Sequence, residues 1–353
     1  MPASSLCADC SHNAGEHEIR KRRLCSDCFI RYVNSKILKR MESYRFKNLS
    51  GDQKKRLLLP LSGGVSSSVL LHALNKQLQK QVEKQNRTAY DLVLVHIEPV
   101  ELEHSVSVAW REGILARFPL HNFPSPVKLY QVFEIDHHIE HDLSRLGIQR
   151  RKGEDNCAFY ASIFNSVSSV TTRADIHQVL MKRLLAALAK RHDCDSIVWG
   201  HSDSKLAAQA LADVAKGRGG SVPAGISDGP SPARVTFNYP MRDLFKTELE
   251  SYAKILEEPL QTIADFESGP MPSIRNTSID DLLSTYILSQ GEKYPSIMAN
   301  VVRTASKLQV PTVGSAGKMC CVCWSFTSDD EHEKNLSEEL CYGCRRMRQD
   351  IRT

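Results

Sequence analysis

Short apolar runs alternate with helical patterns through the middle of the chain. The expected strands are Leu57–Leu61, Asp91–Ile97, Val127–Phe133, Asp195–Trp199 and Arg234–Phe237. Strands that are apolar along their whole length are usually buried on both faces, and helices separate most of these runs. The pattern therefore predicts an α/β fold, in which a parallel sheet carries helices on both faces.

The predicted helices differ in how clearly their apolar positions indicate a packing face. Asp175–Arg191 has the clearest period, with one apolar stripe and its basic side chains elsewhere. Two more apolar patterns, Ile279–Gln290 and Ile297–Leu308, follow a Pro/Ser-rich stretch. They either complete the core or form an interface, because periodicity identifies an apolar face and not what covers it. Pro60 removes a ladder donor, so the first strand is expected to bulge or end early.

Composition indicates the class of protein, and the charge is unevenly distributed along the chain. The chain has 353 residues, of which 41% are hydrophobic and 25% charged, as in soluble globular proteins. No apolar run is long enough to span a bilayer and no signal segment precedes the core, so a cytoplasmic protein without membrane contact is expected. The formal charge is +5, yet the first 56 residues hold 13 Lys/Arg against 6 Asp/Glu. The basic character is concentrated in an N-terminal arm.

That arm contains Arg20, Lys21, Arg22 and Arg23, followed by a predicted helix from Phe29 to about Lys47 with further basic side chains. These basic residues lie near paired cysteines that could bind a metal (see below), and such a grouping is an electrostatic footprint for nucleic acid. The alternative is a solvated helix that tethers this segment to the core. Both interpretations remain open at this point.

Eight of the eleven cysteines form two sets of the same kind. Each set has two Cys-x2-Cys pairs, separated by fourteen residues in the first and seventeen in the second. The sets are Cys7, Cys10, Cys25 and Cys28, and Cys320, Cys323, Cys341 and Cys344. Four thiolates at such spacing predict a tetrahedral structural zinc site at each end of the chain, with iron, disulfides or unrelated thiols as alternatives.

Other potential ligands complicate the two sets. Cys321 stands beside the first pair of the second set, and His12 is close enough to replace a ligand in the first. Cys157 and Cys194 have no partner at metal-ligand spacing and are expected to be buried apolar thiols.

A glycine turn follows the first predicted strand. Ser62-Gly63-Gly64 joins the apolar run to a helical pattern that contains Val69–Leu74. Backbone N–H groups and the positive end of the helix dipole converge in such a turn, which makes it an anion site. A flexible turn without a ligand is the simpler alternative, because a short Ser/Gly turn is a weak signal alone.

Two stretches resemble a superfamily signature while departing from it at the acidic positions. The turn resembles the pyrophosphate loop, SGGxDS, of ATP pyrophosphatases and tRNA-modifying sulfurtransferases, with Ser66 at the position of the aspartate. The second stretch resembles the GHNxDDxAET signature of the same superfamily. Gly200 and His201 match it, whereas the asparagine, the two aspartates and the glutamate have become Ser202, Ser204, Lys205 and Ala208.

A third stretch narrows the resemblance. Lys216-Gly217-Arg218-Gly219, then Val222-Pro223 and Tyr239–Leu249, look like the cytosolic tRNA 2-thiolation protein 2 family. This resemblance covers most of the chain and implies an adenine nucleotide alpha hydrolase-like fold. It also implies a vestigial nucleotide site at Ser62, Gly63, Gly64 and Ser67, no catalytic residue, and RNA contacts at Arg20, Lys21, Arg22, Arg23, Lys216 and Arg218.

The family resemblance implies a function. The chain would be the non-catalytic subunit of a heterodimer whose paralogue has the intact loop and performs the ATP-dependent adenylation. The pair would place sulfur from a thiocarboxylated ubiquitin-related carrier at carbon 2 of the wobble uridine in lysine, glutamine and glutamate tRNAs. Active thiolases also have three core cysteines, but no Cys-x2-Cys lies between Cys28 and Cys320. Loss of the carboxylates makes ATP binding doubtful.

Two other functions compete with this one. An active ATP-dependent enzyme of altered chemistry would explain the retained glycine turn, and a zinc-ribbon RNA-binding adaptor would use the α/β domain as an inert scaffold. The expected domains are an N-terminal zinc ribbon with a basic helix (1–55), the degenerate pyrophosphate-loop domain (56–258), a helical extension (259–315) and a C-terminal zinc ribbon (316–353).

Overall fold

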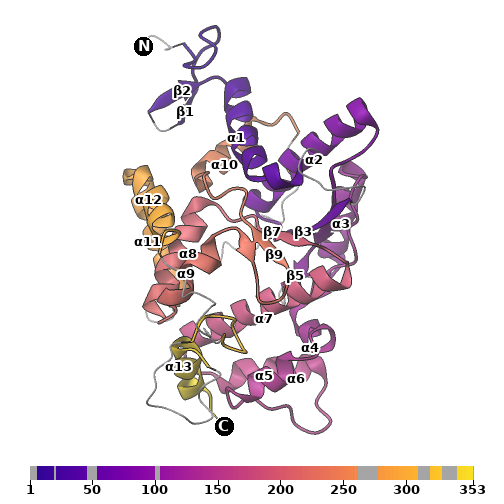
Figure 1. The fold of residues 1–353 in the computed structure, drawn as a ribbon, viewed down its shortest axis with the longest axis vertical. Helices are drawn as coiled ribbons and strands as arrows, with labels where there is room; N and C mark the ends of the chain where they lie inside the picture. The colour runs from indigo at the N-terminus through magenta and orange to yellow at the C-terminus, as the bar shows by residue number, and fades with distance from the viewer. Residues whose placement is uncertain are drawn as a thin grey trace.

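A five-stranded sheet lies at the centre of the molecule (Figure 1). The computed structural model describes residues 6–19, 21–45, 54–99, 104–258, 260, 277–308, 319–327 and 340–352. The strand order is β4-β3-β7-β9-β8, and all neighbours are parallel except the edge pair β8 and β9. The strands are β3 (Lys55–Pro60), β4 (Tyr90–Val95), β7 (Ser196–Val198), β8 (Gly229–Pro230) and β9 (Thr236–Asn238).

Helices cover both faces of this sheet, as predicted. Leu57 and Leu59 of β3 join one buried cluster, whereas Leu58 joins the other. Since successive side chains of a strand point to opposite faces, each cluster fills the space between one face and its helices. The first cluster contains side chains of α1 (Ser26–Arg40), α2 (Val65–Gln85), α3 (His104–Arg117) and α10 (Lys246–Ile255).

The second cluster lies under a larger set of helices and includes the C-terminal cysteines. Its helices are α4 (Val132–Ile135), α5 (Ile139–Ser144), α6 (Asn156–Ser166), α7 (Val170–Arg191), α8 (Asp203–Ala215), α9 (Val222–Ile226), α11 (Ile279–Lys293), α12 (Pro295–Ala305) and α13 (Tyr342–Asp350). Short elements complete the described chain: β1 (His17–Ile19) pairs antiparallel with β2 (Arg22–Leu24), β5 (Ile97–Glu98) pairs with β6 (Val127–Lys128), and 3-10 turns form at Glu42–Tyr44, Leu129–Gln131 and Gly219–Ser221.

One predicted strand is mostly helical. Val127 and Lys128 form β6, but the chain then turns through a 3-10 helix into α4. Leu129, Val132 and Phe133 are all buried, at the spacing of one face of a helix. Their apolar character thus reflected a helical face, and the prediction of a strand to Phe133 was wrong.

The first predicted strand and the basic helix both form, but each ends earlier than the pattern predicts. β3 ends at Pro60, and only Leu57 and Leu58 pair with β7, so the proline nitrogen lies beyond that ladder. The basic helix is shorter than expected, because α1 ends at Arg40 and a 3-10 turn follows; Lys47 lies outside the described residues. No helix in the described part of the chain is long and apolar enough to cross a bilayer.

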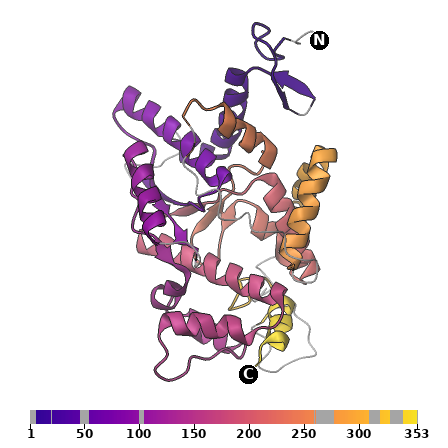
Figure 2. The same ribbon diagram turned by 180° about the vertical axis from the view of Figure 1, so that it is seen from behind.

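α11 and α12 pack side by side against α8 (Figures 1 and 2). Ile287, Met298 and Val302 are buried there, so these two helices do complete the core. Tyr286 and Ile297 remain exposed, which leaves the alternative of an additional interface open.

Candidate functional site

The Ser-Gly-Gly turn lies where β3 leads into α2, at the carboxyl edge of the parallel strands, where α/β sheets bind ligands. Gly63 has φ of 80°, a left-handed conformation that favours glycine. The polar groups of the turn form hydrogen bonds with one another. The Gly64 N–H donates to Ser62 Oγ (3.3 Å), and Ser67 Oγ donates to the Gly64 carbonyl (3.0 Å). The first turn of α2 contains no acidic residue, and Ser66 is half-buried there.

The second signature stretch meets the first one directly. Gly200 follows β7, and a Cβ atom on it would lie 3.1 Å from Ser67 Cα. Only a residue without a side chain permits this approach of the two loops without a shift. The structure thus brings together two stretches about 135 residues apart in the chain. They meet because β3 and β7 are neighbouring parallel strands, whose carboxyl ends lie at the same edge of the sheet.

The start of α8 shows what replaced the missing acids. Ser202 caps this helix, because its Oγ accepts from the Lys205 N–H (3.4 Å). Ser204 Oγ donates to the buried Asp203 (3.0 Å), and the Lys205 side chain is exposed. At the two substituted positions, a hydroxyl and a cation stand where the signature has carboxylates.

His201 is half-buried beside two aromatic side chains. Its ring centroid lies 5.3 Å from that of Trp199 and 5.8 Å from that of Tyr239. Burial, with a smaller effect of Lys205, lowers the pKa of His201 to about 3. The imidazole is therefore neutral near pH 7 and is unsuited to donate a proton as an imidazolium.

The sequence interpretation missed two residues at this edge. His96, just after β4, donates from Nδ1 to the Leu61 carbonyl (2.8 Å), and its buried Nε2 has no partner among the described residues. The Glu98 side chain is fully buried, with Oε1 2.8 Å from His104 Nδ1. The sequence did contain a signal for this pair, because His96 and Glu98 are polar residues at the end of the apolar run of β4.

The predicted nucleotide residues fit an anion better than they fit a metal–nucleotide complex. The hydroxyls of Ser62 and Ser67 and the glycine N–H groups are suitable phosphate donors. Magnesium prefers carboxylate oxygens, and the positions that would supply them hold Ser66, Ser204 and Lys205. The three acidic positions of the signature therefore supply no carboxylate in this chain.

Both cysteine sets are assembled as predicted. Within each set, the four Sγ atoms lie within 4.8 Å of one another. The four Cys-x2-Cys pairs also share one backbone bond, from the residue four positions after the first cysteine to that cysteine's carbonyl. The bonds are Ser11 to Cys7, Phe29 to Cys25, Trp324 to Cys320 and Arg345 to Cys341, at 2.9–3.0 Å. Each set therefore fits one tetrahedral ion, held between a turn that carries the first pair and the start of a helix, α1 or α13, that carries the second.

The additional ligand candidates lie outside both sets. The His12 ring contacts the Cys10 carbonyl, and the Cys321 carbonyl accepts from Arg183 Nη1 (2.8 Å). Cys194 is buried as predicted, and burial raises the pKa of its thiol to about 12. Cys157 is exposed on α6, so the prediction of a buried thiol was wrong for that residue.

Lys216 and Arg218 are buried ion-pair residues rather than surface cations. Lys216 Nζ lies 2.9 Å from Asp175 and 2.7 Å from Asp280, and Arg218 Nη1 lies 3.1 Å from Asp175. Burial disfavours the Arg218 charge, yet the negative charges of Asp175 and of the nearby cysteine thiolates raise the pKa of this guanidinium. The prediction of RNA contacts at these two residues is wrong for this structure, because side chains 1% and 8% exposed do not face a ligand at the surface.

The same motif docks the C-terminal cysteine module onto the core. Arg346 of α13 shares the Asp175 carboxylate (2.8 Å), and a Cβ atom on Gly343 would lie 2.8 Å from Arg218 Nε. Gly217 has φ of 78° and lies against the Tyr342 ring. The Lys-Gly-Arg-Gly stretch is thus explained by packing and charge neutralisation beside four thiols.

Gly343→Ala is expected to lower stability by about 1–3 kcal/mol, because the new methyl group would displace Arg218 from Asp175. Gly291→Ala is a matched control inside α11, where the nearest atom would lie at 3.8 Å. That variant should gain up to about 1 kcal/mol from helix propensity. Thermal unfolding and the rate of metal release measure both; equal effects of the two variants would contradict this account of the docking.

The N-terminal basic arm is exposed where it is described. Lys21, Arg22 and Arg23 lie at the turn and in the second strand of the β1–β2 hairpin, and Arg22 pairs with Asp9. Arg20 lies outside the described residues. On α1, Arg40 pairs with Asp243 (2.7 Å), so part of the basic helix serves packing.

Comparison with known proteins gives a consistent result. The profile of the family described as cytoplasmic tRNA 2-thiolation protein 2 matches residues 278–337. Proteins with that name from Coccidioides immitis and Neosartorya fischeri are each 40% identical, over 98% and 99% of this chain and 98% and 100% of their own lengths. Among solved structures, the U34-tRNA thiolase NcsA from Methanococcus maripaludis, described with its 4Fe-4S cluster, has the same fold, with a TM-score of 0.59, 15% identity and 97% coverage of both chains.

Proposed function

We propose that this chain, which belongs to the cytoplasmic tRNA 2-thiolation protein 2 family, is the non-catalytic subunit of a heterodimeric tRNA thiolase. Family membership and the fold shared with a tRNA thiolase support a role in tRNA 2-thiolation. In this proposal the catalytic paralogue performs adenylation, and the present chain provides structure and tRNA contacts.

One observation carries the non-catalytic assignment. The two signature loops meet at the sheet edge with close backbone approach, yet Ser66, Ser204 and Lys205 occupy the acidic positions. The loops keep the glycines that set their shape, whereas the signature positions that would hold a metal against phosphate carry no carboxylate, and the neighbouring Asp203 is buried. The expected consequence is a folded but inert counterpart of an active site.

The finer details of the proposal come from the family resemblance. The substrate is the wobble uridine of lysine, glutamine and glutamate tRNAs, modified at carbon 2 in the cytoplasm. Sulfur arrives from a thiocarboxylated ubiquitin-related carrier. Lys21, Arg22 and Arg23, with Arg20 beside them in sequence, are the proposed phosphate contacts of the N-terminal arm, since the described three are exposed.

We assign structural zinc to both cysteine sets. Four thiolates without an additional ligand position suit a closed site, whereas a catalytic ion needs an open one. Each site also lies in a segment too short for a core of its own, which metal binding would stabilise. The 4Fe-4S cluster is a property of the NcsA thiolase; within the described residues of the present chain, groups of three or more thiols occur only as the two terminal sets.

Reconstitution tests the function. The chain and its catalytic paralogue, mixed with tRNA, carrier, ATP and magnesium, should form 2-thiouridine, measured by mass spectrometry of digested nucleosides. The paralogue alone should form much less. Full activity of the paralogue alone, unchanged when this chain is added, would show that the chain is not a subunit of the thiolase.

A further inference from the structure

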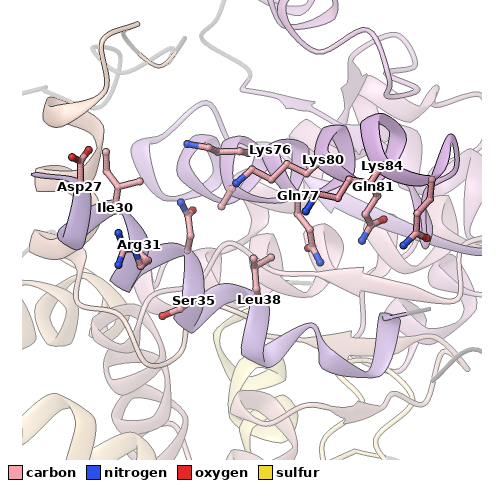
Figure 3. A pocket seen from close by; sticks show the side chains of 13 residues that line it. Asp27, Ile30, Arg31, Ser35, Leu38, Lys76, Gln77, Lys80, Gln81 and Lys84 are labelled. Atoms are coloured by element: carbon pink, nitrogen blue, oxygen red, sulfur yellow. The ribbon is translucent and has the colours of Figure 1, made fainter. Parts of the chain in front are cut away.

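A groove of about 700 Å³ lies between α1 and α2, outside the site described above (Figure 3). Lys76, Lys80 and Lys84 follow one another along α2, and Arg31 comes from α1. All four side chains are exposed. Asp27 is the one acidic residue among the described lining residues.

The three lysines form a continuous row of positive charge. Residues four apart lie on one face of a helix, so the row covers about 12 Å of the α2 axis. Within the described part of the chain, no carboxylate pairs with Lys76, Lys80, Lys84 or Arg31. Their charge is therefore available to an anionic ligand.

Glutamines beside this row are oriented as donors. Gln81 Oε1 accepts from the Ala89 N–H (2.9 Å), and Gln77 Oε1 accepts from Tyr90 Oη (3.2 Å). Because the oxygens are engaged, the two NH2 groups are left to donate. A groove lined by ammonium and amide donors fits a ligand rich in acceptors, such as phosphate and ribose oxygens.

The groove lies between the N-terminal basic module and the Ser-Gly-Gly turn, the two regions on which the proposed function rests. α1 begins directly after Cys25, so one wall continues into the N-terminal cysteine module and its basic hairpin. α2 begins directly after the Ser-Gly-Gly turn. Figures 1 and 2 show the N-terminal module beyond the end of α1.

We propose that the α1–α2 groove binds the sugar–phosphate backbone of tRNA. The inference rests on the proposed function, which supplies tRNA as the substrate, and it names a surface that the motifs do not identify. A row about 12 Å long can face several phosphates, since a nucleic-acid strand carries about one charge per 3.4 Å of helix axis. An acidic protein would need carboxylates at the same spacing along the row of lysines.

The test compares two double variants with equal loss of charge. Lys80→Gln/Lys84→Gln removes two groove cations, while Arg151→Gln/Lys152→Gln removes two exposed cations before α6, at the other end of the molecule (Figure 1). Affinity of the full chain for a labelled tRNA transcript is measured by fluorescence anisotropy between about 50 and 200 mM salt. Circular dichroism and zinc content verify that each variant is folded.

The groove variant should bind roughly 10- to 40-fold more weakly at about 0.1 M salt, with a salt slope smaller by roughly 1.4–1.8, because two fewer phosphates are neutralised. The control variant should bind like the wild type, and Lys80→Arg/Lys84→Arg should restore binding. If the wild type binds tRNA and both Gln variants bind equally well, the groove proposal is overturned and the subunit function stands.

Two further outcomes would also overturn the groove proposal. If the groove variant fails to associate with the paralogue while the assembled complex still binds tRNA normally, the groove is a protein interface. If the wild type binds no tRNA, alone or with the paralogue, the tRNA-binding part of the proposed function fails together with the groove.

Discussion

The purified chain alone, supplied with tRNA, thiocarboxylated carrier, ATP and magnesium, is expected to form no measurable 2-thiouridine. Loss of one well-placed electrostatic group typically costs about 10²–10³ in rate. Here Ser66, Ser204 and Lys205 replace three acids at two facing loops, and Lys205 adds a positive charge. Although such losses are not additive, together they should reduce turnover below detection.

Ser66→Asp should not restore activity. A single carboxylate at the start of α2 would face a second loop that still has Ser204 and Lys205, and His201 there is a neutral base at pH 7. Ser66→Asn is the matched control, with similar volume and no charge. Nucleoside mass spectrometry and pyrophosphate release measure both variants; robust turnover by the unmodified chain would overturn the assignment as a non-catalytic subunit.

Metal removal should have a second large effect, unequal at the two ends. We expect close to two equivalents of zinc in the purified protein. Cys344→Ser should lose one equivalent and lower the melting temperature by roughly 10 °C or more, since several kcal/mol of stability are lost. Cys344 and Met347 are fully buried in the cluster that contains α7 and α8, and the adjacent Arg346 binds Asp175.

Cys28→Ser is the corresponding change in the N-terminal set. It should also lose one equivalent of zinc, but it should shift the main unfolding transition less. Within the described residues, the polar contacts of the segment before α1 stay inside the module or reach the first turn of that helix, at Ser26 and Phe29. Inductively coupled plasma mass spectrometry and differential scanning calorimetry measure both variants, and a chelator-treated protein that keeps its full melting temperature would contradict the structural role of the metal.

The amino-acid sequence by itself determined the fold class and the composition of the metal sites. Leu57–Leu59 and Leu92–Leu94 are apolar without alternation, and only a sheet covered on both faces buries such strands. The cysteine spacing determined the two four-thiol sets, because a knuckle is a local structure whose ligands are close in sequence. The turn at Gly63 was likewise predictable, since its left-handed backbone conformation is a local requirement for glycine.

Tertiary structure alone decided which charges are available. Lys216 and Arg218 look like a basic patch in the sequence, yet both are buried, and Asp175, about 40 residues earlier, forms ion pairs with them. Lys76, Lys80 and Lys84 look like an ordinary solvated helix face, and they become one wall of a groove only because α1 packs beside α2. The reason is physical: periodicity reports which side of an element is apolar, whereas the pairing and desolvation of a charge depend on groups that the fold brings from elsewhere.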